Sequence, residues 1–256
     1  MLPTLTALFQ GPLADFGGRL LLPHQVSATP IPARQLFAAE GLEAVLERQI
    51  ATYVDPAAGA RGCQPPDRRA LMSQWSKYFL SQAIYVPVAA NLLLDRQLPV
   101  ALEELGVTLD AQGLVERLVV ADEGRQVAGR DSESRLRPLM DGLLSPAIAA
   151  MAAHTGIAPR ALWSNAGHYY AYLIDQLQGL PNPPAAVAEG ARLMALGHFA
   201  DGARNPLYRP IRHVIDGAGE SRCVRRVCCV RYRLPELGYC GNCPLPAALA
   251  LPAEEA

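Results

Sequence analysis

The sequence predicts an α+β protein that is mostly helical, with a larger N-terminal domain at 1–215 and a small cysteine-rich domain at 216–256. Apolar residues recur at helical spacing through most of the first domain. The clearest strand signal there is one short hairpin, and five of the six cysteines fall in the last thirty-four residues. Half of the 256 residues are hydrophobic and 18% are charged, which suffices for a folded core and excludes disorder.

The first half of the chain predicts two helices and a hairpin. Five prolines in residues 1–32 predict irregular extended chain. Leucine, valine and isoleucine keep a helical period over 42–50, and aromatic and aliphatic residues do so over 75–84. The Gly- and Pro-containing stretch 61–66 separates these helices. Residues 107–120 predict a β-hairpin, because β-branched residues flank a loop that ends in glycine.

Three further helices are expected before residue 200. Ser145 is the expected N-cap of the first, with a proline at its first helical position, and Gly156 closes it. The second starts near Pro159 and stops at 179–181, where Gly and Pro occur together. The third covers 184–199 and ends before an Asp-Gly pair.

Charge and hydropathy exclude several classes of protein. The formal charge is −1, from 23 basic and 24 acidic residues, so nucleic acid is not an expected partner. The best apolar run, 84–94, is too short for a transmembrane helix and contains Pro87. The first 22 residues lack the pattern of an export signal, since Asp15 interrupts the apolar part and no basic residue precedes Arg19. We expect a cytoplasmic protein, with peripheral association with the inner membrane left open.

The C-terminal segment contains four thiols in two close pairs, beyond the stretch 216–219 where composition changes to Arg and Cys. In a reducing compartment such clustering favours metal ligation over disulfides. Two intervening residues, one of them glycine, let Cys240 and Cys243 reach one metal. Cys228 and Cys229 are adjacent, so in a strand they would point to opposite faces. If both are ligands, the backbone bends there or the two thiols reach different metal ions.

The spacing alone indicates a four-thiolate site and leaves its occupant open. A single zinc needs all four sulfurs at one point, whereas a [2Fe–2S] cluster offers two irons with two thiolate positions each, which suits a vicinal pair better. A vicinal disulfide and buried free thiols are the remaining alternatives. Nearby guanidinium groups, Arg225 and Arg226 above all, would stabilise the reduced form of a cluster or dock an acidic electron donor. The five arginines of this segment are Arg222, Arg225, Arg226, Arg231 and Arg233.

The segment from Arg225 to Leu245 resembles the C-terminal signature of the FhuF-type ferric siderophore reductases, which is C-C-x10-C-x2-C. A Leu-Trp-x-Asn element at 162–165 resembles a second feature of that family. The resemblance implies a cytosolic reductase that holds a [2Fe–2S] cluster and reduces ferric iron in imported siderophores, mainly of the hydroxamate type. The implied ligands are Cys228, Cys229, Cys240 and Cys243.

Cys63 and Cys223 have no place in that pattern, and we expect both to be ordinary thiols. The sequence shows no G-x-G-x-x-G motif, so electrons would come from a reduced ferredoxin, flavodoxin or flavin reductase rather than directly from NAD(P)H. No catalytic carboxylate pair or Ser/His/Asp arrangement is needed beyond the cluster, because reduction weakens every bond between iron and its oxygen donors.

A polar and aromatic patch on the second of the three later helices gives candidates for substrate contact. Trp163, Asn165 and Tyr169 could form a stacking surface for a hydroxamate chelate. The five histidines show no metal-ligand spacing. Two other functions stay open at this stage: a zinc-stabilised binding module without redox activity, and a [2Fe–2S] electron carrier or sensor that acts on no siderophore.

Overall fold

The computed structural model describes residues 3–8, 14, 16, 18–53, 65–127, 129, 131–217 and 219–250. Four residues of the predicted break at 61–66, Cys63 among them, lie outside these ranges. The described chain is mostly helical, with one four-stranded sheet and two smaller strand pairs. The predicted α+β class is confirmed.

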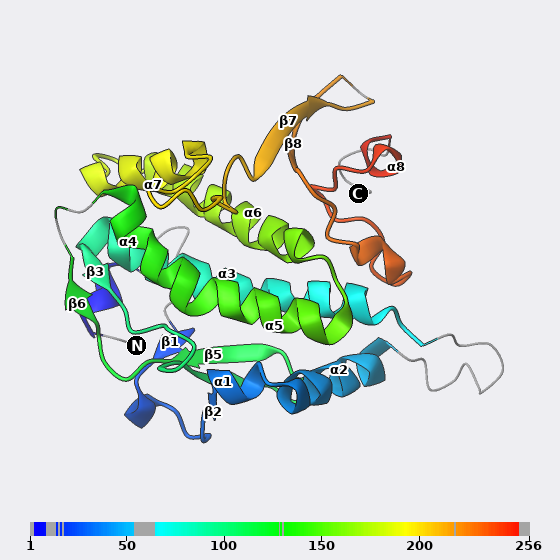
Figure 1. Ribbon diagram of the computed structural model, residues 1–256, viewed down its shortest axis with the longest axis horizontal. Helices are drawn as coiled ribbons and strands as arrows, with labels where there is room; N and C mark the ends of the chain where they lie inside the picture. Colours follow the sequence, from blue (N-terminus) through cyan, green and yellow to red (C-terminus); the bar gives the residue numbers. More distant parts are fainter. Residues whose placement is uncertain are drawn as a thin grey trace.

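The core is built around α3 (Arg68–Leu94), a helix that is apolar on nearly every side and buried over most of its length. The carboxylate of Asp67 caps it by accepting hydrogen bonds from the backbone N–H groups of Arg69 and Ala70. Asp95 ends the helix in the left-handed conformation. In Figure 1 the other long helices lie around α3, and α6 makes the most extensive contact with it.

The helices predicted from periodicity are confirmed. Besides α3 itself they are α2 (Ala39–Tyr53), α5 (Ser145–Thr155), α6 (Pro159–Gln178) and α7 (Ala185–Ala195), which all pack against α3. Helix α4 (Ser132–Leu139), which is not among the predicted helices, packs there too. Gly156 closes α5 in the left-handed conformation, as the sequence predicts. Within the described ranges, no helix is long and apolar enough to cross a membrane.

Two predicted helix boundaries are wrong. Ser145 is not an N-cap, because α4 continues through a π-helical turn (Met140–Leu144) directly into α5 and the preceding Leu144 is already helical. No free N–H groups are therefore left for a serine to cap. The end of α7 comes four residues before the predicted Phe199. There the amide of Asn205 donates to the carbonyl oxygens of Leu193 (2.7 Å) and Leu196 (2.9 Å) and satisfies the helix end from outside.

The predicted hairpin forms the centre of the sheet, which lies on one side of α3 (Figure 1). In spatial order the strands are β1 (Leu20–Leu21), β5 (Val115–Val119), β4 (Gly106–Leu109) and β2 (Ile31–Pro32). Side chains of α3 fasten the hairpin, since Trp75 donates to the carbonyl of Gly113 (2.8 Å) and Gln82 to that of Val115 (2.7 Å).

The remaining elements near the N-terminal end are short. Two 3-10 turns lie where the sequence predicts irregular chain, at Pro3–Leu8 and Pro23–Gln25. Helix α1 (Ala33–Leu36) leads into α2, and β3 (Arg96–Gln97) pairs with β6 (Arg125–Gln126).

The C-terminal segment begins with an antiparallel hairpin of β7 (Ile211–Ile215) and β8 (Ser221–Arg225), which stands out from the helices beyond α6 (Figure 1). Asp216, Gly217 and Gly219, from the stretch where the composition changes, lie between the two strands of this hairpin. A 3-10 turn at Arg231–Arg233 and α8 (Pro246–Leu249) complete the described chain.

A glycine on α6 lets the chain that leads into β7 approach closely. A Cβ atom on Gly167 would lie 2.4 Å from Cβ of Pro210, so only glycine fits without displacing that chain. The hydroxyl of Ser164, one turn earlier, donates to the carbonyl of Val227 just after β8 (2.9 Å). Helix α6 thereby fixes the chain on both sides of the hairpin, just before the segment that carries the four clustered cysteines.

Candidate metal centre

The four thiols of the C-terminal segment meet in a small cluster of their own. Sγ of Cys229 lies 3.7 Å from Sγ of Cys240, and Cys228 lies within hydrogen-bonding reach of Cys243. Cys229, Cys240 and Cys243 are buried, whereas Cys228 is half-buried. The sequence-predicted ligands are therefore brought together from two segments eleven residues apart.

The thiols approach one another as two pairs and not at a single point. Among the described residues, no three His, Cys, Asp or Glu side chains converge closely enough to hold one metal ion. A tetrahedral zinc needs four sulfurs around one centre, while each iron of a [2Fe–2S] cluster takes two thiolates. The pairs Cys229 with Cys240 and Cys228 with Cys243 fit the second demand.

A bend at Val230 lets two neighbouring cysteines face one site. Val230 has a φ of 55°, in the left-handed region that a β-branched side chain rarely adopts. The bend turns the N–H of Val230 toward Sγ of Cys228 (3.3 Å) and the N–H of Arg231 toward Cys229. Backbone N–H groups aimed at sulfur stabilise thiolate and tune a metal centre.

The second cysteine pair sits in a turn that other elements hold in place. The N–H of Cys243 donates to the carbonyl of Cys240 (2.9 Å), and the N–H of Arg225 donates to the carbonyl of Asn242 (3.0 Å). The guanidinium of Arg222 donates to the carbonyl of Gly241 (3.1 Å). The amide nitrogen of Asn242 also lies 2.7 Å from Nε2 of His168 on α6.

Two buried cations face this thiol cluster. Lys77, the only lysine of the chain, projects from α3, is 8% exposed and lies within hydrogen-bonding reach of Cys229. Its Nζ also donates to Oε1 of Gln74 (3.0 Å). Arg225 ends β8 and is 3% exposed. A buried charge is costly unless an opposite charge meets it, so both cations favour a negatively charged site.

The pKa values of the thiols respond to these surroundings. A hydrogen bond from Cys240 and the charges of Lys77 and Arg225 outweigh burial and lower the pKa of Cys229 to about 4. Burial raises the pKa of Cys228 to about 11. The hydrogen bond to Cys229, with burial, raises the pKa of Cys240. Because metals bind the thiolate form, the cations on α3 and β8 favour the thiolate at Cys229, and Cys228 and Cys240 lose their protons on ligation.

The two arginines expected to tune the site differ in environment. Arg225 is buried, and its guanidinium donates to Oδ1 of Asn165 on α6. Arg226 is exposed, and its side chain lies at the wall of a cavity described below. Asn165 itself is fully buried, and its amide donates to the carbonyl of Ser73 (3.1 Å) and to Oγ of Ser76 (3.0 Å) on α3.

The other predicted site residues have separate places. Trp163 is half-buried and lines a cavity. Tyr169 packs edge-on against Tyr85, and burial raises its pKa to about 12. Cys223 is exposed on β8, opposite His213 of β7, and is not part of the thiol cluster.

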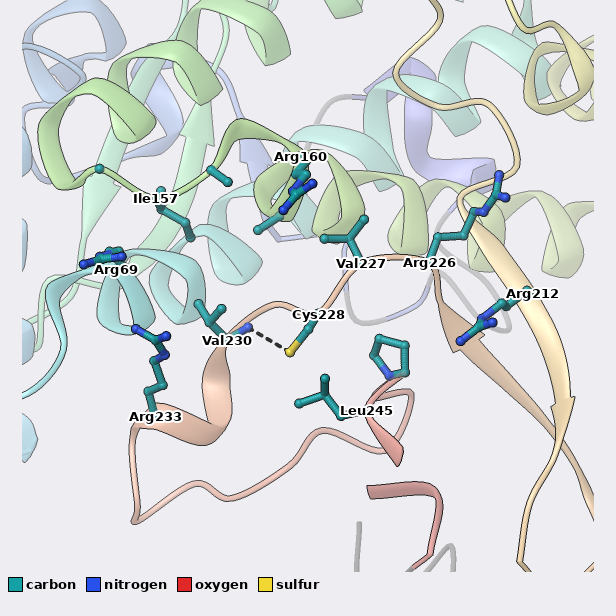
Figure 2. A pocket seen from close by; sticks show the side chains of 14 residues that line it. Arg69, Ile157, Arg160, Arg212, Arg226, Val227, Cys228, Val230, Arg233 and Leu245 are labelled. Carbon is teal, nitrogen blue, oxygen red and sulfur yellow. Dashed lines mark hydrogen bonds between the residues drawn. The ribbon is translucent and has the colours of Figure 1, made fainter. Parts of the chain in front are cut away.

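A cavity of about 570 Å³ opens beside Cys228. Figure 2 shows the sulfur of Cys228 between the lining side chains, with Arg69 and Arg233 to one side of it and Arg212 and Arg226 to the other. Apolar side chains, Ile157, Val227 and Leu245 among them, line the rest. The least buried thiol of the cluster is therefore the one that borders this cavity.

Sequence patterns did not identify Lys77 or the cavity arginines Arg69, Arg160 and Arg212. The arginines come from three separate elements, so no local spacing connects them. Lys77 carries one signal that could have found it, since it is a single lysine within a long apolar helix. A charge at such a position needs a partner inside the protein.

Comparison with known proteins decides the family. Residues 73–221, more than half of the chain, match the family described as "Ferric iron reductase FhuF-like transporter". The chain belongs to this FhuF-like family. The predicted resemblance is confirmed, and with it the prediction of an oxidoreductase that acts on ferric iron.

A second match identifies the cofactor of this FhuF-like protein. Residues 225–245 match the "FhuF 2Fe-2S C-terminal domain", so the cofactor is a [2Fe–2S] cluster, as predicted, and zinc is not needed to explain the cysteines. The ferric siderophore reductase of Escherichia coli (strain K12) is 25% identical over 202 residues, which covers 78% of this chain and 75% of that protein.

Proposed function

We propose that this FhuF-like protein reduces the ferric ion of an imported hydroxamate-type siderophore by one electron and so releases ferrous iron in the cytosol. The observation that carries the proposal is the cavity of about 570 Å³ at Cys228, the half-buried member of an otherwise buried thiol cluster. A chelate seated there would lie against the solvent-facing edge of the metal centre. The similarity to a ferric siderophore reductase supports the same substrate class.

The proposed ligands are Cys228, Cys229, Cys240 and Cys243. When bound, a [2Fe–2S] cluster stores and supplies a single electron. The protein contributes the rest: Lys77 and Arg225 balance the negative charge of the thiolates, and the N–H groups after the vicinal pair point at two of the sulfurs. No group of the chain needs to transfer a proton.

The cavity binds and orients the substrate. Hydroxamate oxygens are hard donors that suit Fe³⁺, and one added electron weakens all the bonds between iron and oxygen at once, so that the iron can leave. Apolar side chains at Ile157, Val227 and Leu245 would exclude water from part of the chelate surface, and guanidinium groups lie among them around the cavity. Trp163 and Tyr169 are not in this cavity's lining, although Trp163 lines the neighbouring one.

We further propose that residues 1–215 hold the substrate and residues 216–256 the cluster. The cavity draws on both parts, since Arg69 and Arg160 come from the first and Cys228 and Leu245 from the second. A reduced ferredoxin, flavodoxin or flavin reductase would supply the electron.

Ferrous release tests the function. The anaerobically purified holoprotein is incubated with a ferric hydroxamate chelate, a ferrous-specific chromogenic chelator and each of the three electron donors in turn. We expect ferrous iron to form catalytically with at least one donor and only when the holoprotein is present. If the holoprotein is reduced by a donor and no ferric chelate is turned over, the protein is an electron carrier or sensor instead.

Serine variants test the ligand assignment. Cys229→Ser and Cys240→Ser should lose most cluster iron, sulfide and visible absorption, because each removes one of four thiolates. Cys63→Ser and Cys223→Ser serve as matched controls and should keep all three at the level of the unmodified protein. An intact cluster in the Cys229→Ser protein would refute the ligand set.

A further inference from the structure

The cavity beside Cys228 is unusually basic. Five arginines line it, from α3, α6, β7 and the segment after β8, and no Asp or Glu is among the described residues of its lining. They are Arg69, Arg160, Arg212, Arg226 and Arg233. Figure 2 shows these side chains distributed around the cavity and not gathered on one wall.

Most of this positive charge is not balanced within the described part of the protein. Arg233 forms an ion pair with Asp67, with Nη1 and Oδ2 2.8 Å apart. Arg69, Arg160, Arg212 and Arg226 are exposed, and none of their guanidinium groups has an acidic partner in the described ranges. Four guanidinium groups are thus available to a ligand.

A second cavity of about 550 Å³ continues the basic surface. It shares Arg160, Val227 and Arg226 with the first, so the two lie side by side, and it adds Arg204 and Arg209. Trp163 and Tyr208 also line it, and the guanidinium of Arg209 lies 5.2 Å from the centre of the Tyr208 ring. A ligand larger than one cavity would meet more guanidinium groups and aromatic faces.

The charge of the ferric chelate decides whether these arginines can contribute to its binding. A ferric ion bound by three hydroxamates has no net charge, and such a chelate offers the guanidinium groups no anionic partner. The planar fork of arginine binds a carboxylate through two parallel hydrogen bonds. A chelate that carries carboxylates, whether or not they bind the iron, would therefore offer the guanidinium groups of the cavity the anionic partners that a neutral chelate lacks.

We infer that the cavity beside Cys228 selects ferric chelates of net negative charge, namely hydroxamates that also carry carboxylate groups, and that Arg160 and Arg226, which border both cavities, are specificity-determining residues. The inference rests on the proposed function. Reduction of Fe³⁺ to Fe²⁺ by one electron makes the chelate one unit more negative, so the same guanidinium groups also favour the reduced product before the iron leaves.

The shape of the cavity favours a small chelate over the acidic face of a donor protein. A protein face would contact exposed arginines on a flat or convex surface, whereas here apolar side chains and Cys228 lie among them within a hollow. The alternative is that the same arginines dock an electron-donor protein, and the experiments below distinguish chelate binding from donor docking.

Binding of redox-inert gallium(III) chelates to the holoprotein tests the inference without turnover. Two probes are compared by calorimetry: a neutral gallium tris-hydroxamate and an anionic gallium complex of a bis-hydroxamate that contains a citrate group. We expect the anionic probe to bind at least about tenfold more tightly at low salt, with the ratio falling as salt screens the charges. Equal affinities at low salt would overturn the inference.

Neutral substitutions test the two residues. Arg160→Gln with Arg226→Gln should weaken the anionic probe about tenfold or more and change the neutral probe less than about twofold. Arg34→Gln, at an exposed arginine whose partner is Glu103, is the control and should change neither. The visible spectrum of each variant reports that its cluster is intact. Unchanged affinity of the double variant for the anionic probe would overturn the inference.

Reduction assays keep this inference distinct from the proposed function. If the neutral ferric tris-hydroxamate is bound and reduced as well as the anionic chelate, the function stands and the inference fails. If neither chelate is reduced, the proposed function itself fails. If the double variant raises KM for the donor protein and leaves both gallium affinities unchanged, the arginines dock the donor and the inference is overturned.

Discussion

The guanidinium of Arg225 donates a hydrogen bond to Oδ1 of Asn165, and both side chains are buried. The amide of Asn165 in turn donates hydrogen bonds to Ser73 and Ser76, so these bonds join β8, α6 and α3 inside an apolar core. Arg225 also faces the thiols, and its backbone N–H holds the turn at Asn242. This network therefore sets where the metal centre lies relative to the helices.

Asn165→Ala should destabilise the fold by about 2–4 kcal/mol, because the buried Arg225 loses an acceptor and two serines lose a donor. In a chain of this size the melting temperature would fall by about 5–10 °C. Gln178→Ala, at an exposed position of the same helix, is the control. A melting temperature within 1–2 °C of the unmodified protein, on the order of the effect of a surface substitution, would contradict the role of Asn165.

Lys77→Met should lower the reduction potential of the cluster by an amount on the order of tens of millivolts, because the change removes a buried positive charge near Cys229. Lys77→Arg keeps the charge and should keep most of the potential. Arg226→Glu should have a smaller effect than Lys77→Met, since Arg226 is exposed and water screens its charge. A potentiometric titration followed by EPR measures all three. Equal potentials in the Met and Arg variants would contradict a role for the charge of Lys77.

Val230 allows a test of the bend that brings the vicinal cysteines together. Val230→Pro should lose most of the cluster, because proline cannot adopt a positive φ and has no N–H for Cys228. Val230→Gly suits the left-handed conformation and keeps the N–H, so its cluster content should match the unmodified protein. Iron and sulfide analysis checks both variants. A fully loaded proline variant would show that neither the bend nor the N–H is needed.

His168 predicts a pH dependence of stability. Burial, and then the charges of Arg225 and Lys77, lower its pKa to about 4 from an ordinary value near 6.5. The folded state thus resists protonation of His168, whereas the unfolded chain is protonated below pH 6.5. The free energy of unfolding is therefore unaffected by this residue above pH 6.5 and falls as the pH drops from 6.5 toward 4, by at most about 1.4 kcal/mol per pH unit. Urea unfolding at pH 7, 6 and 5 should show this slope.

His168→Gln is the matched comparison for the pH dependence. Glutamine does not titrate and still offers a polar partner to Asn242, which lies against the ring of His168. Its slope between pH 6.5 and 5 should be smaller than that of the unmodified protein. The same slope in both proteins would assign the pH dependence to other groups.

Local patterns predicted α2, α3, α5, α6 and α7 because each carries its apolar stripe, cap or stop within its own sequence. The prediction of Ser145 as an N-cap failed because it also used local sequence alone. A serine before a proline favours a helix start unless the preceding residues are already helical, and tertiary packing decides whether they are. The end of α7 depends on Asn205, ten residues beyond the helix, so no stripe or stop signal within the helix could place it.

The features of the site also divide into those that local sequence predicts and those that depend on the fold. The ligand cysteines are close in sequence, and their spacing alone indicates a four-thiolate centre. The arrangement in two pairs, the buried Lys77 and the basic cavity depend on elements that are far apart in the chain. Asn165 is an example: its place in a polar and aromatic patch of the sequence suggests a binding surface, whereas the fold buries it completely.

Single-turnover oxidation of the reduced protein tests the central claim most directly. The holoprotein is reduced anaerobically, freed of reductant and mixed in a stopped-flow cell with one equivalent of a ferric hydroxamate siderophore that carries carboxylates. We predict that the visible spectrum of the oxidised cluster returns as one ferrous ion per chain is captured by a chelator. A cluster that stays reduced, with all the iron still ferric, would contradict the proposal.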